Sequence, residues 1–493
     1  MRFTGRVDAP PADVLHEEIL RPQFEKEART LLPWYVLIEK VLLLEYRRMG
    51  LIDDTQSAAL VSRLNELTPE QITADPEGNM SDLAFAIERY VQGGPEPVPA
   101  AWHVDRSRND LQACAQLLYG RSQLAALIES LVGLARAAAD RAAAGVDLPM
   151  PGYTHLQAAQ VVTPGFYLAA LVEESLRTIR QMRATYDAVD ECPLGAGAMA
   201  GQQLDWDLPR MATLLGFDRP TRHALMAVAS RGWALRVSGD LSAYGVVLSR
   251  FATDLMAWAS GAYRLVDLPD SMVGISSSMP QKRNFPVLER IRGRSAHLTA
   301  LHLDVAMVQR ATPYANMVEV SKEAGSHLNA LFAQAGSVFR LTSTVLAELR
   351  FRPEQMRDAC AGDHLGGFRL ANLLTLRAGL PWRHAQVVAG RYIAAAVDAG
   401  RSPGEPDGPL LRRLAAGYPV TEPTDLLTEA FDVDADLASR TSDGSTGPDA
   451  VRRLLAVQCA ELDEHAAWGR HRRSATTSAV NAVEDQLRGH HVV

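Results

Sequence analysis

Long proline-free segments dominate the middle of this chain of 493 residues. Apolar residues recur through them at helical spacing, as at Leu117, Leu124 and Leu127, and stretches such as LVGLARAAADRAAA are apolar on more than one face. Helices of about 25 to 35 residues exceed the usual mean of about 12, and they need neighbours along their whole length. The sequence therefore predicts an all-α fold with a central bundle of five long helices. These helices are expected over residues 110–144, 164–190, 230–266, 286–310 and 316–350.

Stretches rich in proline and glycine predict three helical domains. GGPEPVPAAW at residues 93–102 is one break, and FRPEQ at residues 351–355 is a second. They divide the chain into an N-terminal helical domain, a central bundle and a C-terminal helical domain, at residues 1–104, 105–351 and 352–493.

Capping residues predict where two bundle helices begin. Asn109 and Asp110 are suitable caps for the first of them. Thr163 precedes Pro164, which is the combination of an N-cap with proline at the first helical position. Gly50 is expected to end an N-terminal helix that contains WYVLIEKVLLLEY.

The composition argues against several classes of protein. The formal net charge is -8, whereas a nucleic-acid-binding domain usually has a basic surplus. The sequence has no apolar run long enough to span a membrane, and its first residues lack the apolar stretch of a signal peptide. Cys114, Cys192, Cys360 and Cys459 are scattered without CxxC spacing, which favours a cytoplasmic protein and indicates neither a disulfide framework nor a zinc site.

The segment HVDRSRNDLQ, residues 103–112, places polar residues at the entrance to the first long helix. Helix N-termini expose unpaired N–H groups and favour anions, and Arg106 and Arg108 beside one suit a carboxylate. Ser107 and Asn109 lie between and after them. Taken by itself, such a run is more often an N-cap with surface arginines.

The segment PGYTHLQAAQVVTPG, residues 151–165, is expected to be a loop between two helices that carries Thr154 and His155. A histidine exchanges protons near neutral pH, so His155 is a candidate general acid or base. A histidine that is satisfied by backbone partners is the commoner case.

The segment PLGAGAMAG, residues 193–201, has GxGxxxG spacing. No strand rich in β-branched residues precedes it, so a dinucleotide-binding turn is rejected. A tight glycine turn that lets the backbone approach a ligand is the more modest prediction.

The segment SMVGISSSMPQKRNFPVLE, residues 271–289, combines three serines with a lysine in one loop. Lys282 can neutralise a carboxylate and Asn284 can donate a hydrogen bond to it. A serine near such a positive cluster could ionise transiently and act as a base. As an isolated loop it would be read as a solvated connector, so only the combination of segments favours a site.

Together these segments resemble the fumarase/aspartase superfamily, and most closely the argininosuccinate lyase family. The family's Gly-Ser-Ser-x-Met-Pro-x-Lys-x-Asn signature corresponds to residues 275–284. The runs Arg-Ser-Arg-Asn-Asp, Tyr-Thr-His-Leu-Gln and Pro-Leu-Gly-Ala-Gly-Ala also match, as do GLPWRHAQVVAG and RTSDGSTGP nearer the C-terminus. The likeness covers nearly the whole chain, and an ordered set of motifs is far more specific than any one of them.

The resemblance implies an enzyme that eliminates an amine or guanidine from an N-substituted aspartate and releases fumarate. By the family's pattern, Ser276 is the catalytic base and His155 assists proton transfer towards the departing nitrogen. Lys282 is catalytic as well, because with Asn284 it holds the carboxylate on which charge develops. No metal, flavin or nicotinamide cofactor is implied.

The resemblance also implies a set of substrate-binding residues and an assembly. The dicarboxylate would be bound by Ser107, Arg108, Asn109 and Thr154. The helix that binds the amino-acid part of the substrate would contain Tyr314, Glu319 and Lys322. The family is a homotetramer in which the long helices form one core and each active site is built from three subunits.

The chain departs from the family's pattern, largely where the family handles the arginine half of the substrate or supports it. Ala84 stands at a histidine position, Glu319 replaces a glutamine and Met317 replaces an aspartate. Ile275 replaces the signature glycine, and MAVASRG at residues 226–232 lacks the acids of its counterpart. We therefore hypothesise that the elimination is retained but that the amine partner differs from arginine. A carboxylate at Glu319 would favour a cationic amine or leave space for a smaller one.

Other functions are compatible with the same sequence. One is an ordinary argininosuccinate lyase of arginine biosynthesis that tolerates these substitutions. Another is a non-catalytic structural protein of the crystallin kind, although the retained Ser276, Lys282 and His155 argue against it. A lyase for a nucleotide or nitro-substituted succinate is a further enzymatic alternative.

Overall fold

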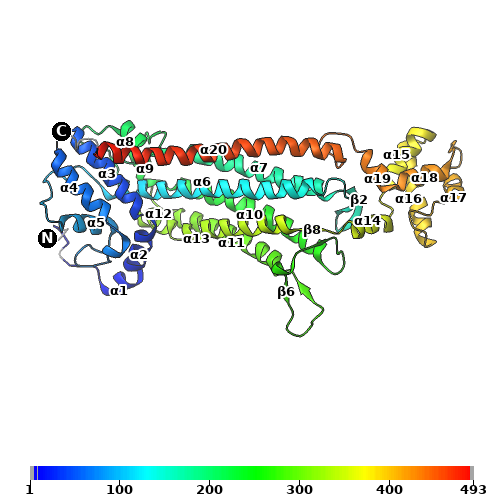
Figure 1. The fold of residues 1–493 in the computed structure, drawn as a ribbon, viewed down its shortest axis with the longest axis horizontal. Coiled ribbons are helices and arrows are strands. Elements are labelled where there is room, and N and C mark those ends of the chain that lie inside the picture. The colour runs from blue at the N-terminus through cyan, green and yellow to red at the C-terminus, as the bar shows by residue number, and fades with distance from the viewer. Residues whose placement is uncertain (1–4, 8, 489–493) are drawn as a thin grey trace.

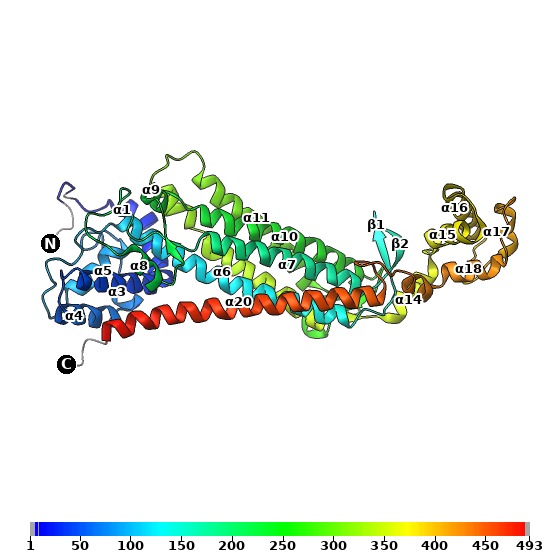
Figure 2. The same ribbon diagram turned by 90° about the horizontal axis from the view of Figure 1, so that it is seen from above.

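The computed structural model describes residues 5–7 and 9–488. The molecule is elongated and predominantly helical, which confirms the expected all-α fold (Figures 1 and 2). A group of shorter helices lies at each end, and a bundle of long helices connects the two groups. No helix in the described part of the chain is both long and apolar enough to cross a membrane.

The bundle contains the five long helices that the periodicity predicts. They are α6 (Arg108–Ala143), α7 (Pro164–Ala188), α10 (Gly232–Ala259), α11 (Pro286–Gln309) and α13 (Leu328–Glu348). Their apolar faces meet in one core that includes Leu131, Ile179, Leu241, Leu298 and Phe339. The long apolar helices are thus buried against one another, as expected.

The fifth helix is shorter than predicted. Residues 318–325 form the short helix α12 (Val318–Ser321) and a turn of 3-10 helix (Glu323–Gly325) instead of continuing α13. The Gln116 side chain donates to the Ser321 carbonyl oxygen at 2.7 Å, and Lys26 Nζ donates to those of Gly325 and Ser326. Side chains from other elements therefore bond to carbonyl groups that a continuous helix would use internally.

A sixth long helix, α20 (Pro448–Arg488), joins the bundle from the far end of the chain. Leu455 and Leu462 contribute to the bundle core, whereas Val483 and Leu487 pack into the core of the N-terminal helices. All four residues lie within 352–493, the range that the sequence assigns to the C-terminal domain, yet they pack into the two other cores. The domain limits at residues 104 and 351 stay a prediction.

The N-terminal helices form one end of the molecule around a core of their own. They are α1 (Asp13–Leu15), a π-helical turn (His16–Leu20), α2 (Arg21–Thr30), α3 (Leu32–Arg48), α4 (Asp54–Glu66), a 3-10 turn (Pro69–Gln71) and α5 (Leu83–Gln92). The short helices α8 (Leu208–Leu214) and α9 (Ala224–Ala229) lie at the same end. Gly50, with φ +70°, follows α3 as the expected C-terminal glycine.

The opposite end is made by short helices after residue 352. They are α14 (Pro353–Gly362), α15 (Gly367–Ala378), α16 (Trp382–Asp398), α17 (Gly408–Leu414), α18 (Pro423–Phe431) and α19 (Val433–Ala438). Helices α15, α16 and α18 share a separate core, which includes Leu370, Leu374, Val388 and Leu427.

Four two-stranded sheets complete the described structure. β1 (Met150–Thr154) pairs with β2 (Gln157–Val162), β3 (Glu191–Cys192) with β4 (Arg219–Pro220), β5 (Val266–Asp267) with β8 (Arg350–Phe351), and β6 (Gly274–Ile275) with β7 (Arg283–Asn284).

The hairpin of β1 and β2 replaces the expected loop. His155 and Leu156 form its two-residue turn with φ of 54° and 61°, conformations usually taken by asparagine or glycine, so the sequence carried no hairpin signal.

Candidate active site

The entrance of α6 and the glycine turn are held together. Ser107, not Asn109 or Asp110 as expected, is the N-cap of α6, and its hydroxyl accepts the Asn109 N–H at 3.2 Å. Because Ser107 takes the cap, Asn109 lies inside the helix, where its amide donates to the Ala198 carbonyl oxygen at 3.0 Å. Two of the predicted segments therefore meet in one place.

Hydrogen bonds to Asp110 hold the backbone of the glycine turn in place. The buried carboxylate of Asp110 accepts the N–H groups of Gly195 and Gly197 at 3.0 and 2.9 Å. Both glycines have positive φ, and a Cβ on Gly197 would lie 2.6 Å from the Gly201 carbonyl oxygen. Burial raises the pKa of Asp110 to about 6, although these N–H groups lower it. Asp110 is a positioning residue that the sequence suggested only as a cap.

The two arginines of the first segment have different environments. Arg106 is buried and forms a bidentate ion pair with the buried carboxylate of Glu39 on α3. It is therefore committed to the packing of α6 on α3 and is not available to a ligand. Arg108 is exposed, pairs with Asp82 at 3.0 Å and lies over the Phe85 ring.

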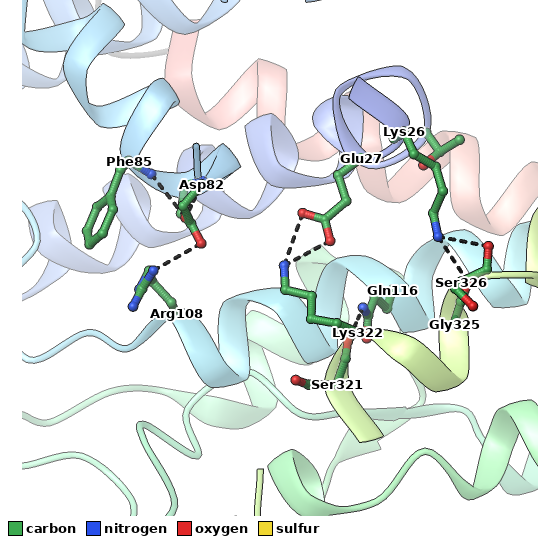
Figure 3. A network of polar contacts seen from close by, with 12 residues as sticks. Lys26, Glu27, Asp82, Phe85, Arg108, Gln116, Ser321, Lys322, Gly325 and Ser326 are labelled. Carbon is green, nitrogen blue, oxygen red and sulfur yellow. Dashed lines mark hydrogen bonds and ion pairs between the residues drawn. The ribbon is translucent and has the colours of Figure 1, made fainter. Parts of the chain in front are cut away.

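The Lys322 side chain points toward Glu27 on α2, in the N-terminal group of helices (Figure 3). Its ammonium group lies 2.8 and 3.1 Å from the two carboxylate oxygens of Glu27 on α2. The nearby Lys26 is partly buried, and this burial lowers its pKa. Tyr314 and Glu319, in contrast, are exposed and make no hydrogen bond with other described residues that would fix them beside Lys322.

Thr154 and His155 lie far from this entrance. Both are exposed at the tip of the β1–β2 hairpin, which follows the C-terminal end of α6. Since α6 has 36 residues and a helix rises 1.5 Å per residue, its two ends are about 54 Å apart. Figures 1 and 2 show the hairpin at the end of the bundle next to α14.

The serine-rich segment forms a loop between β6 and β7 that projects from the side of the bundle (Figure 1). Ser276 Oγ accepts the Met279 N–H at 3.1 Å, and the Lys282 N–H donates to the Met279 carbonyl oxygen at 3.1 Å. Lys282 is exposed and Asn284 is half-buried, while Ile275 is 93% exposed. Such exposure leaves the predicted catalytic groups of this loop free to meet another surface.

Arg283 anchors the base of this loop. Its guanidinium donates to Asp267 at 3.1 Å, to Asp270 at 2.9 Å and to the Leu268 carbonyl oxygen at 3.0 Å. Arg352 also pairs with Asp267 and links the loop to the start of α14. Reasoning from the sequence missed these positioning residues, because nothing in their local pattern indicates which arginine pairs with which aspartate.

Within one chain, the predicted residues therefore lie in separate places. Ser107, Arg108, Asn109 and Lys322 are at the N-terminal end, Thr154 and His155 are on the hairpin, and Ser276, Lys282 and Asn284 are on the projecting loop. The described residues include no group of three or more His, Cys, Asp or Glu side chains that could hold a metal ion. The predicted residues therefore do not form a single constellation within one chain.

Part of the chain matches a known family, and the whole fold is similar to that of solved structures. Residues 72–299, which contain all four polar segments, match the model of a family described as lyase. The whole fold is similar to that of EDDS lyase in complex with formate, with a TM-score of 0.86 and 24% identity over 99% of this chain and 97% of the other. Residues 72–299 thus match a lyase family, and the whole chain has the same all-α fold as EDDS lyase, in agreement with the all-α fold that the sequence predicted.

Two further structures have the same fold. An EDDS lyase variant with bound fumarate has a TM-score of 0.84 and 23% identity over 99% of this chain and 97% of the other. Class II fumarase from Schistosoma mansoni has a TM-score of 0.66 and 16% identity over 82% of this chain and 88% of the other.

Proposed function

We propose that the protein is a carbon–nitrogen lyase that converts an N-substituted aspartate into fumarate and an amine. The observation that carries this proposal is the projecting loop of residues 275–284, which presents the matching signature on an anchored base in a chain of this fold. EDDS lyase, a variant of which has been solved with fumarate bound, shares the fold over 99% of this chain.

The reaction would begin with proton removal from the carbon beside a carboxylate. Ser276 takes this proton, and the electron pair moves onto the carboxylate held by Lys282 and Asn284. The C–N bond then breaks, the carbon–carbon double bond of fumarate forms, and His155 supplies the proton that the departing nitrogen takes. Since a carbon acid of this kind is very weak, stabilising the doubly charged intermediate is the main task of the site.

The serine needs help to act as a base. Nearby positive charge and exclusion of water lower the pKa of a hydroxyl, and Lys282 is the cation of this loop. The loop would close over the substrate and bring Ser276 to it, because its small residues and its exposed position permit movement.

The active site would be shared between subunits of a homotetramer. The distance of about 54 Å between the ends of α6 supports this proposal, because the two sets of residues cannot meet within one chain. Val246 on α10 and Leu303 and Met307 on α11 are at least half exposed, which fits helices that pack against further copies.

The amine partner would differ from arginine, because the departures at Ala84, Met317 and Glu319 fall on the amine side of the substrate. A panel of N-substituted aspartates that includes argininosuccinate tests this, with fumarate absorbance as the measurement. Clear preference for argininosuccinate would identify an ordinary argininosuccinate lyase, and absence of fumarate from every compound would favour a non-catalytic protein.

A further inference from the structure

Asp105, just before α6, forms hydrogen bonds to the loop that follows the glycine turn. Its Oδ2 accepts the backbone N–H groups of Gln203 and Leu204, both at 2.8 Å, and the indole Nε1–H of Trp206 at 3.0 Å. Its carbonyl oxygen accepts an N–H of the Gln202 side-chain amide at 2.8 Å. Asp105 thus bonds to four residues of one loop, which lie 97 to 101 positions later in the chain.

The hydrogen bonds of the Asp105 carboxylate are charge-assisted. Burial by itself would raise the pKa of Asp105, but the N–H groups of Leu204, Trp206 and Gln203 outweigh it and lower that pKa below its ordinary value. Hydrogen bonds to an ionised acceptor are roughly twice as strong as those between neutral groups. The carboxylate therefore holds the loop more firmly than an uncharged acceptor would.

The surroundings of Asp105 are fixed as well. The Trp206 ring lies edge-on to the ring of Tyr46 on α3, with 5.2 Å between their centroids, and the Tyr46 hydroxyl donates to the Val104 carbonyl oxygen at 2.8 Å. The backbone of Asp105 has φ 58°, in the left-handed region that few side chains adopt, and such conformations persist where the surrounding contacts determine them. This backbone lets both the carboxylate and the carbonyl oxygen of Asp105 bond to the same loop.

Asp105 and Asp110 hold the two ends of one exposed stretch, residues 198–201. Asp110 binds the glycine turn before this stretch, and Asp105 binds the loop after it. Within the stretch, the Ala198 carbonyl oxygen accepts the Asn109 amide N–H at 3.0 Å. The two aspartates therefore fix from both sides the backbone that bonds to Asn109.

The orientation of the Asn109 amide depends on this stretch. An amide carries its donor and its acceptor on different atoms, so the hydrogen bond to Ala198 decides which of them is turned away from the loop, toward a ligand. Asp110 alone fixes only one end of residues 198–201. Without the bonds to Asp105, the other end would be free to move, and the amide would lose its fixed acceptor.

We propose that Asp105 is a positioning residue of the dicarboxylate site, which holds residues 198–201 against Asn109 without touching the ligand. This inference rests on the proposed lyase function and adds to it a residue that local sequence patterns did not single out. Ser276 and His155 lie on other elements, so loss of Asp105 should weaken ligand binding more than it slows the chemical step.

The variant Asp105→Gly tests the role of the carboxylate, because glycine adopts positive φ readily but has no side-chain acceptor. We expect the Kd of fumarate, measured by titration calorimetry, and the KM of the best N-substituted aspartate to rise about tenfold. The value of kcat should change less than about threefold. Amide hydrogen exchange in residues 202–206 should become faster, which shows that the loop has been released.

Asp105→Asn is the conservative variant. Asparagine tolerates positive φ and keeps one oxygen acceptor, so the Kd of fumarate should rise only about threefold. If Asp105→Gly does not fold, this smaller rise decides the question. Asp205→Gly is the matched control, since Asp205 lies in the same loop with a side chain that is 98% exposed, and it should leave Kd and KM unchanged.

The outcomes separate this inference from the proposed function. Unchanged Kd and KM in the Asp105 variants, or equal losses in Asp205→Gly, would refute the positioning role and leave the lyase function standing. If no N-substituted aspartate releases fumarate, the lyase function fails, whereas the fumarate titration still decides the role of Asp105. If fumarate does not bind the unmodified protein either, both proposals are wrong.

Discussion

Asp110 is the residue that joins the entrance of α6 to the glycine turn. Asp110 is 1% exposed, its carboxylate accepts the N–H groups of Gly195 and Gly197, and the positive charge of Arg106 lowers its pKa. Burial nevertheless dominates and raises the pKa of Asp110 from 3.8 to about 6. The protonated carboxyl is therefore better tolerated in the folded protein than in the unfolded chain.

The stability of the protein should depend on pH through this residue. Because the folded pKa is above the unfolded one, the contribution of Asp110 is fully present below pH 3.8 and is lost as pH rises through about 6. The loss is about 3 kcal/mol. In Asp110→Asn, which keeps an oxygen acceptor, this pH dependence should disappear.

The measurement is the free energy of unfolding of both proteins between pH 4 and 8, since the difference between them removes the contributions of other groups. Asp254→Asn is the control, because Asp254 lies near the C-terminal end of α10 and accepts a hydrogen bond from the Tyr167 hydroxyl, away from the turn. Parallel pH curves for the original protein and Asp110→Asn would show that Asp110 ionises normally.

At the scale of elements, the projecting loop between β6 and β7 depends on a short sheet and one arginine. The sheet has two residues in each strand, which is too little to hold the loop by backbone hydrogen bonds alone. Arg283 adds contacts to Asp267, Asp270 and the Leu268 carbonyl oxygen. The position of Ser276 therefore depends on a residue that does not react.

Loss of this anchor should slow catalysis more than it destabilises the fold. Exposed ion pairs contribute about 1 kcal/mol or less to stability, but misplacing a catalytic group costs about tenfold or more in rate. We expect Arg283→Gln to lower kcat at least tenfold, to make residues 271–285 more sensitive to protease, and to shift the melting temperature little. Arg290→Gln, an exposed arginine on the adjoining helix α11, should change none of these. Unaltered kcat in Arg283→Gln would show that the loop is positioned by other contacts.

At the scale of the whole molecule, the bundle separates residues that the proposed reaction needs together. Ser276 lies on the projecting loop and His155 on the hairpin tip, while Asn109 is at the far end of α6. His155 is exposed, and Asn109 and Ser276 are half-buried. In the proposed homotetramer, assembly of several copies would bring the surfaces that carry these residues together, and closure of the projecting loop would complete the site.

Mixing two inactive variants should therefore restore activity. Ser276→Ala and His155→Gln should each be inactive alone, but when they are unfolded together and refolded as a mixture, about a quarter of the shared sites should contain both original residues. Recovered fumarate release, compared with each variant refolded alone, is the measurement. A mixture as inactive as its components would show that both residues act within one chain or that one of them is not required.

Local sequence patterns predicted much of this structure. The apolar periodicity along residues such as Leu124 and Leu127 predicted the long helices, and Thr163 with Pro164 predicted the start of α7, because both signals act between residues close in sequence. The polar segments and their order predicted the lyase resemblance. The hairpin at His155 and the break before α13 could not be predicted, because each depends on contacts with distant residues.

The sequence by itself thus determined an all-α bundle, since helix periodicity is a local property, and from side-chain chemistry it proposed candidate residues for an elimination. Only the tertiary structure decided that Arg106 pairs with Glu39 and that α20 completes the bundle. The physical reason is that the pairing of buried charges and the packing of helices depend on which distant segments meet, and no local pattern records that.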